Sequence, residues 1–290
     1  MLTGLGLYLW VIYRIEGGGE GKPPAPERVA ERAAEMGLSH VLIKVADAQW
    51  NYNVHQGVDL VPPLVSELHK RGIQAWGWQY IYGLEPSAEA TASVKRVTEL
   101  KLDGFVVNAE IEFREHGMDR AARQYMAGLR AGVGMTPIGF SSFRFPTKHR
   151  PLPFEAFLEK SDINMPQVYW VGADNPEAQL ARSIAEYKAL GWTGQTFPTG
   201  AAYKERGWQP TLDQVQRFLD ACVAQGLDGA NFWEWLHAVQ FYESVIKEFD
   251  GWRDPVRKDE EAEPEIAVDA LEQWRQLQKQ RKAAGKPVAV

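Results

Sequence analysis

The most constraining feature of this sequence is a regular alternation of strand-like and helix-like segments along its first ~250 residues. The strand-like runs are short and rich in β-branched and aromatic residues, and their starts are separated by roughly 26 to 35 residues. We therefore predict eight strands, starting at Gly6, His40, Gln74, Gly104, Pro137, Ile163, Gln195 and Gly229.

Amphipathic helix-like segments occupy the intervals between these strands. Four of them end in a glycine just before the next strand, at Gly37, Gly72, Gly191 and Gly226, which is a helix C-cap signal. Eight such units in about 250 residues predict an α/β fold of the (β/α)8 TIM-barrel class, because an open doubly wound sheet rarely needs eight units of even period. The fifth helix, within residues 150–162, is predicted to be the weakest because it is short and proline-rich.

The character of the chain changes after Asp250. A charged, proline-containing linker leads into a predicted helix over about residues 263–284, which carries a narrow apolar stripe. We therefore predict a barrel over residues 1–250 and a linker with a C-terminal helical tail over residues 251–290. The stripe predicts packing back onto the barrel, or self-association or an assembly contact with another subunit.

Composition and charge exclude several classes of partner. The net charge is -6 and no long Lys/Arg block is present, which argues against nucleic acid as a partner. The apolar start of the chain lacks a basic leader and a cleavage site and is too short to span a bilayer. We therefore expect no signal peptide, no transmembrane segment and no membrane partner, with synthesis in the cytoplasm.

Two further patterns have ordinary structural interpretations. The single cysteine, Cys222, excludes an intramolecular disulfide and falls in a predicted helix, so we expect a buried thiol. Residues 17–22 (GGGEGK) resemble a phosphate-binding loop but lack its spacing and its Ser or Thr, and they predict a flexible loop after the first strand.

The predicted fourth strand, GFVVNAEIEF from Gly104, ends in an unusual set of polar residues. Alternate residues of a strand share a face, so Asn108, Glu110 and Glu112 are predicted to lie together. In a TIM barrel the C-terminal strand ends form the working face, and we expect these side chains to line its mouth. An alternative for Glu110 is a structural ion pair with Lys44 of a neighbouring strand.

The other strand ends supply further carboxylates, amides and aromatic rings. Carboxylates act as acid, base or nucleophile, amides hydrogen-bond hydroxyl groups, and aromatic faces stack on sugar rings. Only one of Trp233 and Trp235 is expected to face the lumen, and the other is expected to pack under a helix. The remaining candidates are Asp47, Gln79, Tyr80, Gln167, Tyr169 and Glu234.

Other chemistries lack their motifs. The six histidines show no HExxH or paired ligand spacing, and neither a GxSxG elbow nor a dinucleotide-binding fingerprint is present. We therefore predict no metal and no cofactor, which leaves acid–base work by carboxylates.

Residues 40–83 (HVLIKVADAQWNYNVHQGVDLVPPLVSELHKRGIQAWGWQYIYG) resemble the second unit and third strand of family 25 glycoside hydrolases, the muramidase (lysozyme) family. The run GFVVNAEIEF then matches the family's strand-four DxE motif. The resemblance implies a barrel that cleaves the glycan of peptidoglycan, with Glu110 at the position of the family's general acid. Asn108 stands where the family has Asp, and strand one lacks the family's early Asp.

These features lead to a preferred hypothesis and two alternatives. The first is a glycoside hydrolase of muramidase type, in which Glu110 protonates the glycosidic oxygen and Glu112 or Asp47 assists. The glycan is then held by Asn108, Gln79, Tyr80, Gln167, Tyr169, Trp233 and Glu234. By the resemblance, such an enzyme would reach the cell wall as phage lytic proteins do. The second is a catalytically degenerate barrel that binds glycan or serves a phage tail or cell-surface assembly, and the third is a barrel acting on another polysaccharide.

Overall fold

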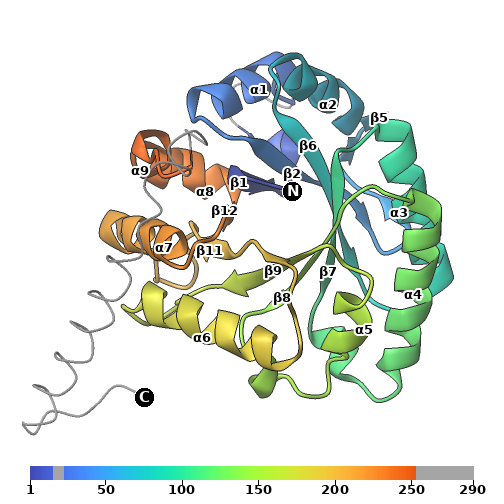
Figure 1. Cartoon of the computed structure of the whole chain (residues 1–290). Coiled ribbons are helices and arrows are strands. Elements are labelled where there is room, and N and C mark those ends of the chain that lie inside the picture. Colours follow the sequence, from blue (N-terminus) through green and yellow to red (C-terminus); the bar gives the residue numbers. More distant parts are fainter. Residues whose placement is uncertain (16–22, 253–290) are drawn as a thin grey trace, which may run out of the picture. The chain divides into compact units, whose positions relative to one another are not determined.

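The computed structural model describes residues 1–15 and 23–252, and within them eight parallel strands form a closed barrel. Strand β1 pairs with both β12 and β2, which closes the ring and confirms the predicted TIM-barrel fold. Figure 1 shows the strands enclosed by the helices. The strands are β1 (Gly4–Leu9), β2 (His40–Asp47), β6 (Gln74–Ile81), β7 (Gly104–Ala109), β8 (Ile138–Phe143), β9 (Ile163–Val168), β11 (Thr199–Ala201) and β12 (Gly229–Trp233).

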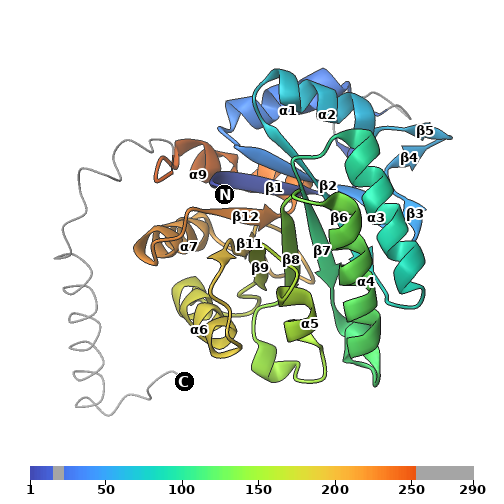
Figure 2. The ribbon, with the colours of Figure 1, turned by 45° about the vertical axis from the view of Figure 1, so that its right-hand side comes forward.

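Helices follow the strands and pack outside the barrel (Figure 2). The glycines that end four predicted helices all have positive φ angles, between 67° and 86°, as the C-cap signal requires. The fifth helix has only five residues, as its proline-rich sequence predicted. The helices are α1 (Pro26–Glu35), α2 (Val61–Lys70), α3 (Pro86–Leu100), α4 (Met118–Val133), α5 (Phe154–Leu158), α6 (Pro176–Ala189), α7 (Leu212–Ala224), α8 (Trp235–His237) and α9 (Glu243–Glu248).

The loops contain short strands and short helical segments. Strand β3 (Trp50–Asn51) pairs antiparallel with the end of β2, and β4 (Val54–His55) pairs with β5 (Val58–Asp59). The single seventh strand predicted from Gln195 is wrong in detail, since the chain forms β10 (Gln195–Thr196) and then β11. The 3-10 turns are η1 (Ile12–Arg14), η2 (Ile111–Arg114) and η3 (Pro146–Lys148), and η4 (Ala238–Tyr242) is a short π-helix.

The predicted first strand is too long. The strand-like run that starts at Gly6 (GLYLWVIYR) continues to Arg14 in the sequence, but β1 ends at Leu9. Beyond Leu9 the side chain of Asn53 replaces a neighbouring strand as hydrogen-bond partner of the backbone. It accepts a hydrogen bond from the backbone N–H of Ile12 (2.8 Å) and donates to the carbonyl of Trp10 (3.1 Å). These backbone groups are thereby satisfied without a neighbouring strand.

Large apolar side chains fill the barrel interior. The central cluster contains Tyr8, Leu42, Trp76, Trp78 and Met165, and Tyr80 and Trp233 pack against it from above. Because side chains alternate along a strand, the residues next in line beyond this cluster are carried to the C-terminal mouth. The lower barrel is therefore a packed core, and any site must lie above it.

The compact unit formed by the barrel runs from Met1 to Phe249. Cys222 is buried and free, as expected. Among the described residues, no helix is both long and apolar enough to cross a bilayer. The predicted glycine-rich loop and, from residue 253, the predicted linker and C-terminal helix lie outside the described residues.

Candidate active site

The acidic end of strand β7 differs from the predicted extended run. The strand ends at Ala109, and Glu110 precedes the short helical turn η2, so the expectation that Glu112 continues the same strand face is wrong. The turn redirects Glu112, whose Oε2 accepts a 2.7 Å hydrogen bond from the hydroxyl of Tyr80 on the adjacent strand β6. Alternation within β7 still carries Asn108 to the mouth on the same face as Val106, which belongs to the interior cluster.

A pair of amide side chains holds the carboxylate of Glu110. Its Oε1 accepts from Asn108 Nδ2 at 3.1 Å and from Gln167 Nε2 at 2.9 Å. Gln167 Nε2 also lies 3.1 Å from Asn108 Oδ1 and 3.4 Å from the hydroxyl of Ser141. No described residue hydrogen-bonds to Glu110 Oε2. One carboxylate oxygen is therefore fixed by strands β7 and β9, and the other is available to a ligand.

A cavity of about 420 Å³ lies above this amide–carboxylate group, within the usual size range of small-molecule sites. Five predicted site residues line it, namely Asn108, Glu110, Gln167, Tyr169 and Trp233. The structure therefore brings together residues from β7, β9 and β12 that the sequence separates by more than a hundred positions. The other lining residues are Phe143, Arg144, Phe145, Lys148, His149, Tyr203 and Glu205.

The surroundings of two aromatic side chains of the cavity fix the position of Trp233 and the protonation of Tyr169. The ring of Trp233 lies 5.4 Å from that of Trp78 and 5.6 Å from that of Tyr8, centroid to centroid. Burial raises the pKa of Tyr169 well above its ordinary value, and the negative charge of Glu110 adds to the rise. Tyr169 therefore remains a neutral phenol that can donate a hydrogen bond.

Tyr80 lies beside the cavity rather than in its lining. Its pKa is raised first by burial, then by the hydrogen bond to Glu112, and then by the charges of Glu110 and Glu112. Tyr80 thus connects Glu112, in η2, to the barrel interior. Glu112 is occupied by this contact and does not line the cavity.

Asp47 is engaged by a lysine. Lys44 forms an ion pair with Asp47, so the alternative that pairs Lys44 with Glu110 is wrong. The ammonium group lies 4.2 Å from the ring centroid of Tyr52 and 4.9 Å from that of Trp78. Burial lowers the pKa of Lys44, and the contact with Asp47 opposes that shift. Asp47 does not line the cavity.

Gln79 is placed away from the cavity. It precedes the inward-facing Tyr80 and therefore points outward, where it is fully buried against α3 and α4. Its amide donates to the carbonyl of Glu89 and its Oε1 accepts from the hydroxyl of Tyr125 (2.7 Å). This placement corrects the prediction that Gln79 and Tyr80 both face a ligand.

Glu234 is also placed elsewhere. Its carboxylate caps the short helix α8 by accepting from the backbone N–H groups of Leu236 and His237. It borders an adjoining hollow of about 310 Å³ and not the cavity that contains Glu110. Of the two tryptophans considered from the sequence, Trp233 lines the cavity and Trp235 is buried, as expected for one inward-facing residue.

Sequence reasoning missed the loop that follows β8. It supplies Arg144, Phe145, Lys148 and His149 to the cavity, next to Phe143 at the end of β8. The signal was present as basic and aromatic residues at the end of the fifth predicted strand (PIGFSSFRFP, residues 137–146) and directly after it (TKH, residues 147–149). Among residues 1–15 and 23–252, no cluster of three or more His, Cys, Asp or Glu side chains is placed to hold a metal ion.

Comparison with known proteins finds similarity in structure and not in sequence. No family model matches the chain, and no curated protein matches it. A chitinase from Bacteroides thetaiotaomicron superimposes with a TM-score of 0.66 at 9% identity, covering 88% of this chain and 98% of that one.

Two further structures extend this similarity. A chitinase from Chromobacterium violaceum gives 0.60 at 12% identity (87% and 100% covered). The spore cortex-lytic enzyme SleL of Bacillus megaterium gives 0.60 at 9% identity (84% and 72% covered). The chain thus shares its barrel fold with glycoside hydrolases, while the resemblance to family 25 stays a prediction.

Proposed function

We propose that this protein is a glycoside hydrolase that cleaves a glycan of 2-acetamido sugars, peptidoglycan first among them, with Glu110 as the general acid. The observation that carries the proposal is the Glu110 carboxylate, fixed at one oxygen and open at the other, in a cavity at the C-terminal ends of the barrel strands. Chitinases and a cortex-lytic enzyme among the structural neighbours support the same class of substrate.

The hydrogen bonds of Glu110 determine where its proton resides. Both lone pairs of Oε1 are engaged by the N–H donors of Asn108 and Gln167. When Glu110 is protonated, the proton is therefore on Oε2, from which it passes to the glycosidic oxygen as the bond to the leaving sugar breaks. Asn108 and Gln167 act as positioning residues in this step.

The second requirement is a group that offsets the positive charge at the anomeric carbon. Glu112 is bound by Tyr80 and Asp47 by Lys44, and the other acidic residue of the cavity, Glu205, is exposed. This arrangement favours substrate assistance over a second protein carboxylate. The carbonyl oxygen of the sugar's own 2-acetamido group attacks the anomeric carbon, and water then opens the cyclic intermediate with retention of configuration.

Tyr169 and Trp233 fit this route. The neutral phenol of Tyr169 can donate to the acetamido oxygen and orient it. The ring of Trp233, held by Tyr8 and Trp78, offers a rigid face on which a sugar ring can stack.

Hydrolysis of labelled peptidoglycan and of chitin oligosaccharides tests the proposal. We expect Glu110→Gln to lower kcat by about 10²–10⁴-fold, the usual contribution of a general acid. Glu115→Gln, an exposed change on the same turn, serves as the matched control and should leave kcat within about twofold. Equal rates for the wild type and Glu110→Gln would refute the role of Glu110.

Two further measurements address the second group. De-N-acetylated oligosaccharides should resist cleavage, because they lack the attacking carbonyl. If they are cleaved as fast as the acetylated forms and Glu112→Gln abolishes activity, Glu112 takes the role assigned to the acetamido group.

A non-catalytic glycan-binding barrel, for example a subunit of a phage tail or cell-surface assembly, is the second candidate. The amide of Asn108, which cannot take a proton, is the observation that favours it. A wild-type protein that sediments with cell walls yet releases no sugar would select this function.

A further inference from the structure

The loop after β8 gives one wall of the cavity a positive charge. Strand β8 is the direct neighbour of β7, so this wall adjoins Glu110. It carries Arg144, Lys148 and His149. The chain as a whole has a net charge of -6, so these cations do not follow from general composition.

Three cations surround one buried ring. The guanidinium carbons of Arg144 and Arg182 lie 4.9 Å and 4.1 Å from the ring centroid of Phe145, and Lys148 Nζ lies 5.5 Å from it. Like charges this close repel each other, and the ring face compensates only partly. An external anion would remove the repulsion.

Two of the three cations have no acidic partner. Arg182 is paired with Glu186 at 2.8 Å, whereas neither Arg144 nor Lys148 forms an ion pair with any described residue. Burial lowers the pKa of Arg144, and the nearby charge of Arg182 lowers it further. Placing a cation in a half-buried position without a carboxylate is costly, unless the ligand brings the anion.

His149 experiences the same positive environment. Its ring stacks on Phe143 with the centroids 3.7 Å apart. Its pKa is lowered first by burial and then by the charges of Arg114, Arg144 and Lys148. Its Nδ1 is buried and has no hydrogen-bond partner among the described residues.

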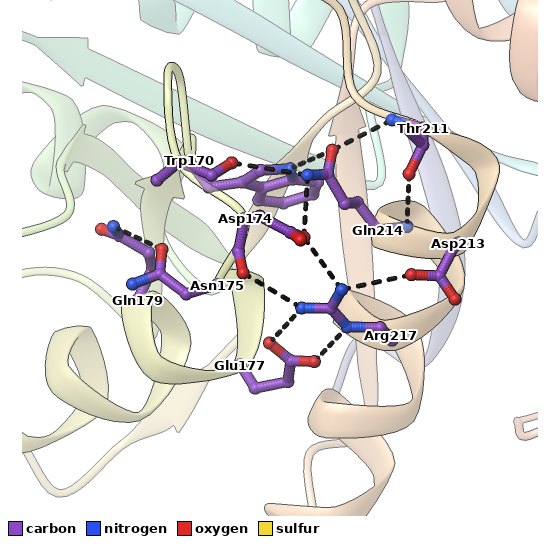
Figure 3. A network of polar contacts seen from close by, with 10 residues as sticks. Trp170, Asp174, Asn175, Glu177, Gln179, Thr211, Asp213, Gln214 and Arg217 are labelled. Atoms are coloured by element: carbon purple, nitrogen blue, oxygen red, sulfur yellow. Dashed lines mark hydrogen bonds and ion pairs between the residues drawn. The ribbon is translucent and has the colours of Figure 1, made fainter. Parts of the chain in front are cut away.

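Arg144 is oriented in advance. Its Nε donates to Gln179 Oε1 at 3.0 Å, and Gln179 is itself held by Asn175 Oδ1 at 3.1 Å at the start of α6 (Figure 3). The terminal Nη1 and Nη2 groups make no hydrogen bond to the described residues. A guanidinium fixed through Nε presents these groups to a ligand with little loss of side-chain freedom.

We propose that Arg144, Lys148 and His149 form a subsite for a carboxylate carried by the sugar next to the scissile bond. The inference rests on the proposed function for the position of the sugar. A planar guanidinium binds a carboxylate in bidentate fashion, and an ammonium group adds a second charge-assisted contact. Two sugar chemistries supply such a group, the lactyl ether of a muramic acid and the ring carboxylate of a uronic acid.

Binding to the full-length chain carrying Glu110→Gln, which leaves the glycan intact, tests the subsite. The probes are a muramic-acid-containing tetrasaccharide, a tetrasaccharide of alternating glucuronic acid and N-acetylglucosamine, and the same two glycans with their carboxyl groups reduced to alcohols. We expect at least one carboxylated glycan to bind about 10-fold more tightly than its reduced twin. The glycan that shows the preference identifies the source of the carboxylate.

Charge variants in the same background assign the preference. Arg144→Gln combined with Lys148→Gln should reduce the preference for the carboxylated glycan to under about twofold. Lys148→Gln alone changes an exposed side chain, so a reduced preference in this single variant is not explained by misfolding. Arg182→Gln is the matched control, because Arg182 contacts the same ring but does not line the cavity, and it should retain the preference.

Equal binding of each glycan and its reduced twin, or no binding of any probe, overturns the subsite. So does a preference that survives the double variant. A preference without hydrolysis by the wild type would overturn the enzymatic proposal and leave the subsite standing, and hydrolysis without a preference would do the reverse.

Discussion

His40 provides a quantitative test of how the barrel interior is built. It begins β2 and is fully buried, with Nε2 2.7 Å from Asn231 Oδ1 and Nδ1 2.9 Å from the hydroxyl of Ser39. Burial lowers the pKa of its imidazole to about 4, and the hydrogen bond to Asn231 opposes the shift only in part. In the unfolded chain the same group titrates near its ordinary value of about 6.5.

The direction of the pH effect follows from proton counting. Between pH 6.5 and pH 4 the unfolded chain binds the proton and the folded chain does not, so acid favours unfolding. The contribution of neutral His40 is fully present above about pH 6.5 and is lost as the pH falls to about 4. A difference of about 2.5 pKa units, at about 1.36 kcal/mol per unit, makes the loss about 3 kcal/mol.

Urea denaturation at pH 7 and pH 4 measures this loss. The comparison is between the wild type and His40→Gln, whose amide does not titrate but can donate to Asn231. Carboxylates contribute equally to both proteins, so the wild type should lose about 3 kcal/mol more of its unfolding free energy than the variant. If both proteins lose the same amount, the buried neutral imidazole is not responsible for acid sensitivity.

Three further changes have defined outcomes. Gly6→Ala would place a Cβ 2.1 Å from His40 Nε2, and thermal denaturation should show a loss of at least about 1–3 kcal/mol, the usual cost of overpacking; an unchanged Tm would contradict the close packing. Gln167→Leu removes a donor from Glu110 and should lower kcat by about 10-fold or more with a smaller change in KM; a change in KM alone would assign Gln167 to binding. Arg217→Met removes the ion pairs that join α7 to Asp174 of the β9–α6 loop and to Glu177 in the first turn of α6 (Figure 3), and it should lower the unfolding free energy by about 1–2 kcal/mol, since the pairs are partly exposed; a loss of the same size in 1 M salt would argue against an electrostatic origin.

The barrel itself could be predicted because its signals are local and repeated. Strand-like runs, helix periods and glycine caps such as Gly37 and Gly72 each act within a few residues, and eight repeats leave little ambiguity. The candidate carboxylate was found for the same reason. Glu110 follows an apolar run at the end of a strand, where barrel sites occur.

The ends of the strands could not be predicted from period alone. The alternation of apolar and polar residues continues past Ala109, yet the backbone turns at Glu110, where pairing with β8 has ended at Asn108 and pairing with β6 at Ala109. The partner of Lys44 depends on a bulge after that residue in β2, which rotates Asp47 toward it. The end of β7 and the bulge in β2 arise from the pairing of strands that are distant in the sequence, so the apolar–polar period of the sequence does not predict them.

The loop residues were missed because a loop has no period. In the sequence, Arg144 and Lys148 have the pattern of ordinary solvated charges. Only the folded barrel places them on the cavity wall beside Glu110. Their significance lies in missing acidic partners, which only three-dimensional structure reveals.

The amide contacts between β7 and β9 have an evolutionary consequence. Gln167 extends past Ser141 of the intervening strand and donates hydrogen bonds to both Asn108 and Glu110. A change at any one of positions 108, 110 and 167 therefore leaves a polar atom of the other two residues without its hydrogen-bond partner. In descendants of a common ancestor these three positions should therefore be inherited as a block, and a lineage that discards the acid should discard its two amides as well.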